Sequence, residues 1–289
     1  MNEIAKTIET LLAGAGAANR KSPLKDLGFL SCASTVHIKH APFYDPCLIL
    51  VLSGTKTLFK DGKAVSCTAG SLLAVPGPSS FDLRNAPDPI TKKYTALLIP
   101  FKVELIDRLI RSHNLVHEVR REPVNVIGFE LDKTLHESIH HYLTTLGNAK
   151  LLNHRLMEIL LVLATRNPAL LSFGLHRVEW EGRVRAVLSA DLARTWTLAE
   201  VCKQLATTES TLRRNLKREG MNFREVLYEL RLASALTQLL QTSLPIYRIA
   251  YDCGYQSVSR FTSNFHKRFG VPPKQFRAMA SETEQSLTA

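Results

Sequence analysis

Long apolar runs are missing from this sequence: no stretch approaches the roughly 18 consecutive apolar residues that a membrane-spanning helix needs. Near the N-terminus, Glu3 and Glu9 interrupt apolar residues at helical spacing, so the continuous apolar segment of a secretion signal is missing as well. The mean hydropathy of -0.04 and the 22% of charged residues fit neither a membrane-embedded chain nor a wholly disordered one. We therefore expect a cytoplasmic protein without a membrane partner.

Cysteine is scarce, with 5 residues that nowhere form a C-x-x-C pair. An odd number of unpaired positions argues against a disulfide framework and favours a reducing compartment. The three N-terminal cysteines, Cys32, Cys47 and Cys67, are either small apolar residues of a core or a thiol sensor.

Most catalytic signatures are also missing, including G-x-S-x-G, a Gly-rich phosphate loop and the dinucleotide-binding fingerprint. The exception is the segment in which His136, Glu137 and His140 spell H-E-x-x-H. On a helix this spacing places both imidazoles on one face, as in a zinc metalloprotease, and Glu158 is a conceivable third ligand. The same helix has an apolar face that we expect to be buried, made by Leu131, Leu135, Ile139 and Leu143. The histidines lie beside or opposite this face, which favours a solvated position for them. We expect no catalytic residue, metal or cofactor, and we keep a zinc hydrolase as an alternative.

Positive charge is in excess and unevenly distributed. The chain has 37 Lys and Arg against 26 Asp and Glu, a net charge of +11. Residues 183–280 carry 16 basic and 7 acidic residues, a net of +9, whereas residues 1–182 carry +4. This distribution is typical of a nucleic-acid-binding module joined to a nearly neutral one.

The sequence pattern divides the chain in two. Short apolar runs with Gly, Asp and Pro between them fill residues 29–98 and predict an antiparallel sandwich or small barrel. After Pro100 the apolar period becomes three to four residues, which predicts two or three trailing helices. We expect a sensor or dimerisation domain over 1–168, a linker over 169–178, an all-helical domain over 179–280 and a tail over 281–289. The fold class is therefore α+β.

The all-helical part contains a first helix-turn-helix pattern. An apolar face over 198–205 is followed by Thr208, which is suited to cap a second helix over 209–219. Long Arg donors on the outward face of such a helix suit guanine edges and phosphates in a major groove. The outward positions are Ser210, Arg213, Arg214 and Lys217.

A second such pattern follows a long helical stretch over 223–242. Gly254 supplies a turn, and Ser257 opens a helix whose Phe261, Phe265 and Phe269 recur at i+4, a spacing that we assign to the core. The outward positions of this helix are Ser259, Arg260, Ser263 and Lys267.

The segment from 184 to 279 resembles the AraC/XylS family of bacterial transcriptional regulators, most specifically in I-A-Y-D-C-G-Y-Q-S at 249–257 and F-H-K-R-F-G-V-P-P at 265–273. The resemblance implies two recognition helices on one rigid domain, set by a linker helix so that both enter successive major-groove segments. It places the base-contacting positions of the two helices on Ser210, Arg213 and Arg214, and on Val258, Ser259, Arg260 and Ser263.

One departure from the family concerns the first turn, where Ala206 stands at a position that is often Gly. A non-Gly residue in a left-handed turn costs about 1–2 kcal/mol. We therefore expect the first helix-turn-helix to be less rigid or differently posed.

The N-terminal half is similar to the cupin-like sensor domains of such regulators, on the residues of 46–54 and 70–76. This likeness implies a pocket for a small molecule or partner and a dimer interface on the helices. Polar candidates on an early strand and turn are His37, Lys39, His40 and Tyr44, for which ordinary surface positions are the alternative.

These observations predict a sequence-specific regulator that binds double-stranded DNA. By the resemblance it activates transcription with RNA polymerase as partner, forms a homodimer and responds to a small-molecule effector. The alternatives are the zinc hydrolase and a non-specific architectural DNA-binding protein.

Overall fold

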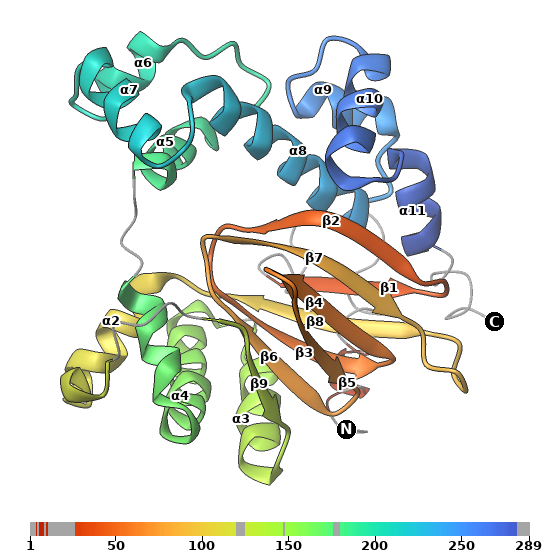
Figure 1. Ribbon diagram of the computed structural model, residues 1–289. Coiled ribbons are helices and arrows are strands. Elements are labelled where there is room, and N and C mark those ends of the chain that lie inside the picture. Colours follow the sequence, from red (N-terminus) through yellow and green to blue (C-terminus); the bar gives the residue numbers. More distant parts are fainter. Residues whose placement is uncertain are drawn as a thin grey trace. The chain divides into compact units, whose positions relative to one another are not determined.

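The computed structural model describes residues 4, 6–8, 10, 27–119, 125–146, 148–175 and 180–281. The chain forms two compact units, one made mainly of residues up to His176 and the other mainly of Arg177–Ala280 (Figure 1). In the described part, no helix is both long enough and apolar enough to span a bilayer.

The first unit contains two antiparallel sheets, which confirms the predicted fold class. One has the strand order β1-β8-β3-β6-β9 and the other β2-β7-β4-β5. The strands are β1 (Gly28–Cys32), β2 (Val36–Phe43), β3 (Cys47–Ser53), β4 (Thr55–Lys60), β5 (Lys63–Thr68), β6 (Ser71–Val75), β7 (Ser79–Ala86), β8 (Tyr94–Pro100) and β9 (Ile127–Glu130).

Two turns show why the strands end where they do. Gly54 joins β3 to β4 at φ 77°, and a Cβ there would overlap the carbonyl oxygen of Ala86, so only Gly fits. Asp61 and Gly62, between β4 and β5, have φ 50° and 74°, as a two-residue hairpin turn requires.

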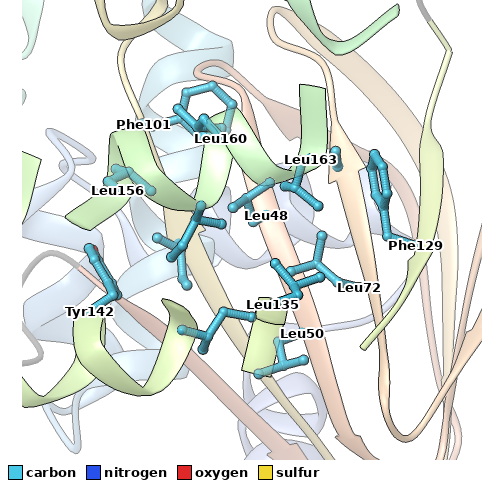
Figure 2. Close-up of a cluster of buried hydrophobic side chains, with 14 of the residues drawn as sticks. Leu48, Leu50, Leu72, Phe101, Phe129, Leu135, Tyr142, Leu156, Leu160 and Leu163 are labelled. Atoms are coloured by element: carbon cyan, nitrogen blue, oxygen red, sulfur yellow. The ribbon is translucent and has the colours of Figure 1, made fainter. Parts of the chain in front are cut away.

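Helices cover one face of the five-stranded sheet. They are α2 (Val103–Ser112), the 3-10 helix η1 (Val116–Glu118), α3 (Lys133–Thr144), α4 (Ala149–Arg166) and the 3-10 helix η2 (Pro168–Leu175). Leu135 of α3 and Leu160 of α4 meet Leu48, Leu50 and Leu72 of the sheet in one buried cluster, which Figure 2 shows. The apolar spacing of three to four residues thus fulfils its predicted role as the buried face of these helices.

The first unit differs from the sequence expectation in two places. Strand β9 lies after the predicted end of the sheet, because its four residues are too few to reveal a strand pattern; it pairs with β6. The expected linker over 169–178 is also packed in its first part, since Leu170, Leu171 and Phe173 are fully buried. An apolar run that follows Pro168 continues the core against α2 and α4 instead of crossing between domains.

The second unit is all helical. Its helices are α5 (Trp180–Leu188), α6 (Leu198–Gln204), α7 (Glu209–Arg218), α8 (Phe223–Gln241), α9 (Ile246–Asp252), α10 (Val258–Phe269) and α11 (Pro273–Ser281). Helix α5 packs against α6, α7 and α8, and α9 packs against α8 and α10. Figure 1 shows α8 running between one helical group that contains α6 and α7 and another that contains α9 and α10.

Candidate nucleic-acid interface

Helix α6 begins with a complete capping box. The Thr197 hydroxyl accepts from Glu200 N, and the Glu200 carboxylate accepts from Thr197 N at 2.8 Å. Hydrogen bonds from the side chain and backbone of Thr197 hold the pKa of Glu200 below its usual range. These bonds satisfy amide groups that helix geometry leaves unpaired, so the start of the first helix-turn-helix is fixed locally.

The turn after α6 places Ala206 at φ 49°. Ala206, unlike a glycine, has a Cβ, and it therefore adopts the left-handed conformation that the sequence analysis predicts to be costly at this position. The corresponding turn after α9 has Gly254 at φ 79°, where the conformation is free of that penalty.

Helix α7, which the sequence predicts to be the first recognition helix, is capped by Thr208, whose side chain accepts from Thr211 N. Leu212 and Leu216 are buried on its inner face. The outer side chains predicted from sequence are exposed together, as Ser210, Arg213, Arg214 and Lys217, with Arg218 beside them. Glu209 pairs with Arg213 at 3.1 Å, so this guanidinium begins with a carboxylate partner that a DNA acceptor would have to replace.

Helix α10, which the sequence predicts to be the second recognition helix, is capped by Ser257, whose hydroxyl accepts from Arg260 N at 3.3 Å. Its three phenylalanines are buried, with ring centroids of Phe265 and Phe269 at 4.7 Å, which confirms their assignment to the core. Of the predicted outer residues, Ser259, Arg260, Ser263 and Lys267 are exposed and Val258 is half-buried.

Arg268 does not belong to this exposed set. Its Nε lies 2.8 Å from Glu229 Oε2 on α8, and only 16% of its side chain is exposed. This ion pair links α10 to α8, so the guanidinium is occupied before any DNA arrives.

Arg231 in the middle of α8 connects the two helix-turn-helix groups. Its Nε donates to Leu192 O at 3.0 Å and its Nη2 to Arg194 O at 3.0 Å, both in the segment that leads into α6. The same guanidinium lies against Gly254 in the turn between α9 and α10. Burial lowers the pKa of Arg231. The two carbonyl oxygens accept hydrogen bonds from its charged guanidinium and so offset part of the cost of burying it.

The segment after α7 is anchored as well. Glu219 accepts from Trp180 N at 3.0 Å and from Glu181 N at 2.8 Å, and so caps the first turn of α5. A carboxylate at a helix N-terminus satisfies free amides and complements the helix dipole. The end of the first recognition helix is thereby fixed to the rest of its helical group.

The H-E-x-x-H segment lies on α3 with His136 and His140 half-buried and Glu137 exposed. Glu158 is engaged elsewhere: it accepts from Ser138 Oγ at 3.2 Å and pairs with Arg155 at 3.0 Å. Across the residues that the structure describes, no three His, Cys, Asp or Glu side chains come together as metal ligands.

The five cysteines are all free and buried. Burial raises the pKa of Cys32 and Cys67 to about 11 and that of Cys47 to about 12. Since the thiolate is the reactive form, these thiols are held in their inert state, which favours the interpretation as core residues over a thiol sensor.

The polar candidates predicted in the first unit lie at the surface. His37, Lys39 and His40 are exposed on β2, and Tyr44 is half-buried after it. Among the buried polar side chains that sequence reasoning missed are Lys56 and Asn85, which are 2% and 0% exposed. The only sequence signal for Lys56 is its place in T-K-T-L-F, where strand alternation puts it on the same face as Leu58.

Two family models match the chain: a helix-turn-helix domain over residues 201–279 and the ExsA N-terminal regulatory domain over residues 46–173. Curated relatives from Escherichia coli include the activator CsvR, 40% identical over 94 residues, and the urease operon transcriptional activator, 34% identical over 97 residues. These alignments cover 32% and 34% of this chain and 35% and 33% of the relatives, so the chain spans about a third of their length.

Solved structures share the fold. ToxT from Vibrio cholerae O395 has a TM-score of 0.62 at 16% identity, with 89% of this chain and 99% of that chain covered. A structure of wild-type ToxT with bound unsaturated fatty acid has a TM-score of 0.64 at 16% identity, with 89% and 96% covered. The helix-turn-helix model and the ExsA regulatory-domain model thus match the two halves of the chain, which is similar in both to transcriptional regulators of the AraC/XylS type.

Proposed function

We propose that this chain is a transcriptional activator that binds specific sites on double-stranded DNA through α7 and α10. The observation that carries the proposal is the pairing of two capped helices in one unit, each with its apolar face buried and its basic face exposed. A helix that is fixed at its N-terminus and presents Arg donors outward has the form that major-groove reading requires.

The exposed residues divide by the contacts they would make. Side chains near the helix N-termini would reach base edges: Ser210, Arg213 and Arg214 on α7, and Val258, Ser259, Arg260 and Ser263 on α10. Lys217 and Lys267, at the far ends of the same faces, would contact phosphates. Phosphate contacts supply affinity without sequence information, whereas base contacts supply the specificity.

The remaining assignments rest on the family and on the first unit. That unit, expected over 1–168, would sense a small molecule or form a homodimer, and the DNA-bound protein would contact RNA polymerase. The likeness to fatty-acid-bound ToxT supports a small-molecule effector. A regulator of this kind would act on DNA in the cytoplasm and would need no catalytic residue.

The test is binding of the full chain to fragments of its own genome, with random competitor DNA and at two salt concentrations. We expect enrichment of a few sites of about two helical turns each, because two recognition helices read successive major-groove segments. Uniform enrichment would instead indicate an architectural DNA-binding protein and would contradict the proposal.

Two variants sharpen this experiment. Arg260→Ala should reduce the discrimination between specific and random DNA by about 1–3 kcal/mol, whereas Lys267→Ala should weaken both alike. Each is the other's control, because both side chains are exposed on α10. Equal losses on both DNAs for both variants would refute the division into base and phosphate contacts.

No observation favours the zinc hydrolase, because the conceivable third ligand, Glu158, is held by Arg155 and Ser138. Stoichiometric zinc in the purified protein that disappears in a His140→Ala variant would reverse this judgement.

A further inference from the structure

A polar cluster lies inside the first unit, where two sheets face each other. We define the Lys56 cluster as Lys56, Asn85 and Tyr94 together with the three thiols of Cys32, Cys47 and Cys67. Lys56 is 2% exposed, and Asn85 and Tyr94 are fully buried. A lysine this deeply buried normally has an acidic partner.

Strand register brings these residues together from both sheets. In the four-stranded sheet, Lys56 of β4 lies opposite Cys67 of β5 and opposite Asn85 of β7, which forms one row across three strands. In the five-stranded sheet, Tyr94 of β8 lies opposite Cys32 of β1. Both rows lie on the inner faces of their sheets, since every member of the two rows is buried, with 4% exposure or less.

The cluster is rich in donors and poor in acceptors. Lys56 Nζ donates to Asn85 Oδ1 at 3.0 Å, which leaves two ammonium protons unused. Asn85 Nδ2 and the Tyr94 hydroxyl are buried without a hydrogen-bond partner. Within the described chain no carboxylate pairs with Lys56, so its charge is uncompensated in the interior. Buried polar groups are rarely left in this state unless something else occupies the site.

What would satisfy the cluster is an acceptor with one negative charge. A water molecule would use one or two donors but would need acceptors for its own two protons, and thiol sulfur is a weak acceptor. A dianion such as phosphate would leave one charge unpaired, because Lys56 supplies only one positive charge. A carboxylate has two oxygens and about four lone-pair sites in a plane, which match donors that come from different strands.

We propose that the Lys56 cluster is a binding site for a carboxylate monoanion, held by Lys56 Nζ, Asn85 Nδ2 and the Tyr94 hydroxyl. The site lies inside the first unit, apart from His37, Lys39 and His40, which are exposed on the outer side of β2. The inference rests on the proposed function only in taking the first unit as the sensor. The carboxylate can belong to bicarbonate, to a short organic acid or to a fatty acid, and the experiment separates these sources.

The experiment uses the full chain and measures calorimetric binding of sodium bicarbonate, acetate, octanoate and decanoate at constant ionic strength, with chloride as the reference anion. We expect saturable binding of at least one of the four. Binding of bicarbonate or acetate alone would identify a small anion, and binding that strengthens from octanoate to decanoate would identify a fatty acid. Absence of binding by all four, or equal binding of chloride, would overturn the proposal.

Variants locate the bound anion. Lys56→Met should abolish binding, and Lys60→Met, an exposed lysine on the same strand, should leave it unchanged. Tyr94→Phe removes one oxygen and should weaken binding about tenfold or more, since a hydrogen bond to a charged group is lost. Without ligand, Tyr94→Phe should unfold at the same or a higher temperature than wild type, because the hydroxyl has no partner to lose. Binding that persists in both Lys56→Met and Tyr94→Phe would place the anion elsewhere and refute the site.

The regulatory role is tested separately by measuring DNA binding with and without the bound anion. A site that binds the anion while DNA binding is unchanged would leave the Lys56 cluster as a carboxylate site and contradict only the sensor role of the first unit.

Discussion

The guanidinium of Arg231 occupies the space into which a side chain on Gly254 would project: a Cβ built there would lie 2.5 Å from Arg231 Cζ. Because Arg231 also donates to the carbonyls of Leu192 and Arg194, one side chain of α8 contacts the approach to the first helix-turn-helix and the turn of the second. The relative placement of the two recognition helices thus depends on an interaction that needs both the Arg and the missing Cβ.

Gly254→Ala should destabilise the second unit by about 2–5 kcal/mol. About 1–2 kcal/mol comes from the left-handed backbone at φ 79°, and the rest from overlap with Arg231 and the Leu192 carbonyl oxygen. Urea unfolding followed by circular dichroism of the full chain measures this loss.

The matched control for that prediction is Gly220→Ala. Gly220 has nearly the same backbone, with φ 77°, but nothing lies within 4 Å of a Cβ there. Its substitution should cost only about 1–2 kcal/mol. Equal losses of unfolding free energy in the two variants would mean that the contact between Arg231 and Gly254 does not contribute to stability.

Ala206→Gly should stabilise the second unit by about 0.5–1 kcal/mol. The substitution relieves the left-handed strain at φ 49°, and the greater freedom of Gly in the unfolded chain offsets part of the gain. The comparison is Ala199→Gly on the exposed face of α6, where the same change should cost about 0.5–1 kcal/mol. A shift of the unfolding midpoint in the same direction for both variants would contradict the assignment of strain to Ala206.

The sequence predicted the helical unit in detail because its signals are local. Capping residues such as Thr208 and Ser257, and the i+4 phenylalanines, act within one or two helical turns and can be read from spacing. Strand β9 and the Lys56 cluster could not be predicted in this way. Their partners are distant in sequence, since Lys56 and Asn85 are 29 positions apart. The environment of a side chain between two sheets also depends on register, which no short pattern reveals.

The same limit explains the position of Arg268. Its sequence neighbours suggest that Arg268 is one more DNA-contacting cation of a basic helix. The sequence then predicts seven such cations, the others being Arg213, Arg214, Lys217, Arg218, Arg260 and Lys267. The bond of Arg268 to Glu229 on α8 crosses 39 residues of sequence. Six exposed cations remain, and if each neutralises phosphate charge, including those that also reach base edges, the slope of log affinity against log salt should be about -5.

Lys267 and Arg268 are adjacent, and they should respond in opposite ways to neutralisation. Lys267→Gln should make the salt slope shallower by about 0.9 with little effect on stability, because its side chain is exposed. Arg268→Gln should leave the slope unchanged and lower the free energy of unfolding by about 1–3 kcal/mol, because Glu229 loses this partner in a largely buried position. Titrations at four salt concentrations and urea unfolding of both variants measure the two quantities, and a shallower slope for Arg268→Gln would return Arg268 to the DNA-contacting set.

Lys56 should make the stability of the first unit rise with pH. Burial lowers its pKa from 10.5 to about 8, so below pH 8 the ammonium is charged in both the folded and the unfolded chain. Between pH 8 and 10.5 the folded chain has lost this proton while the unfolded chain retains it, and stability increases wherever the unfolded state binds more protons. The slope approaches about 1.4 kcal/mol per pH unit in that range.

The thiols around Lys56 act in the other direction above about pH 9, because burial raises the pKa of Cys32, Cys47 and Cys67 and the unfolded chain therefore ionises first. Subtracting the unfolding free energy of Lys56→Met from that of wild type at each pH removes most of this contribution. Since methionine has no charge to bury, the variant should be as stable as wild type or more stable at pH 7, and wild type should gain on it as the pH rises from 8 to 10. Urea unfolding in buffers free of carboxylates measures the difference, and parallel curves for the two proteins across this range would show that Lys56 does not titrate as a buried amine.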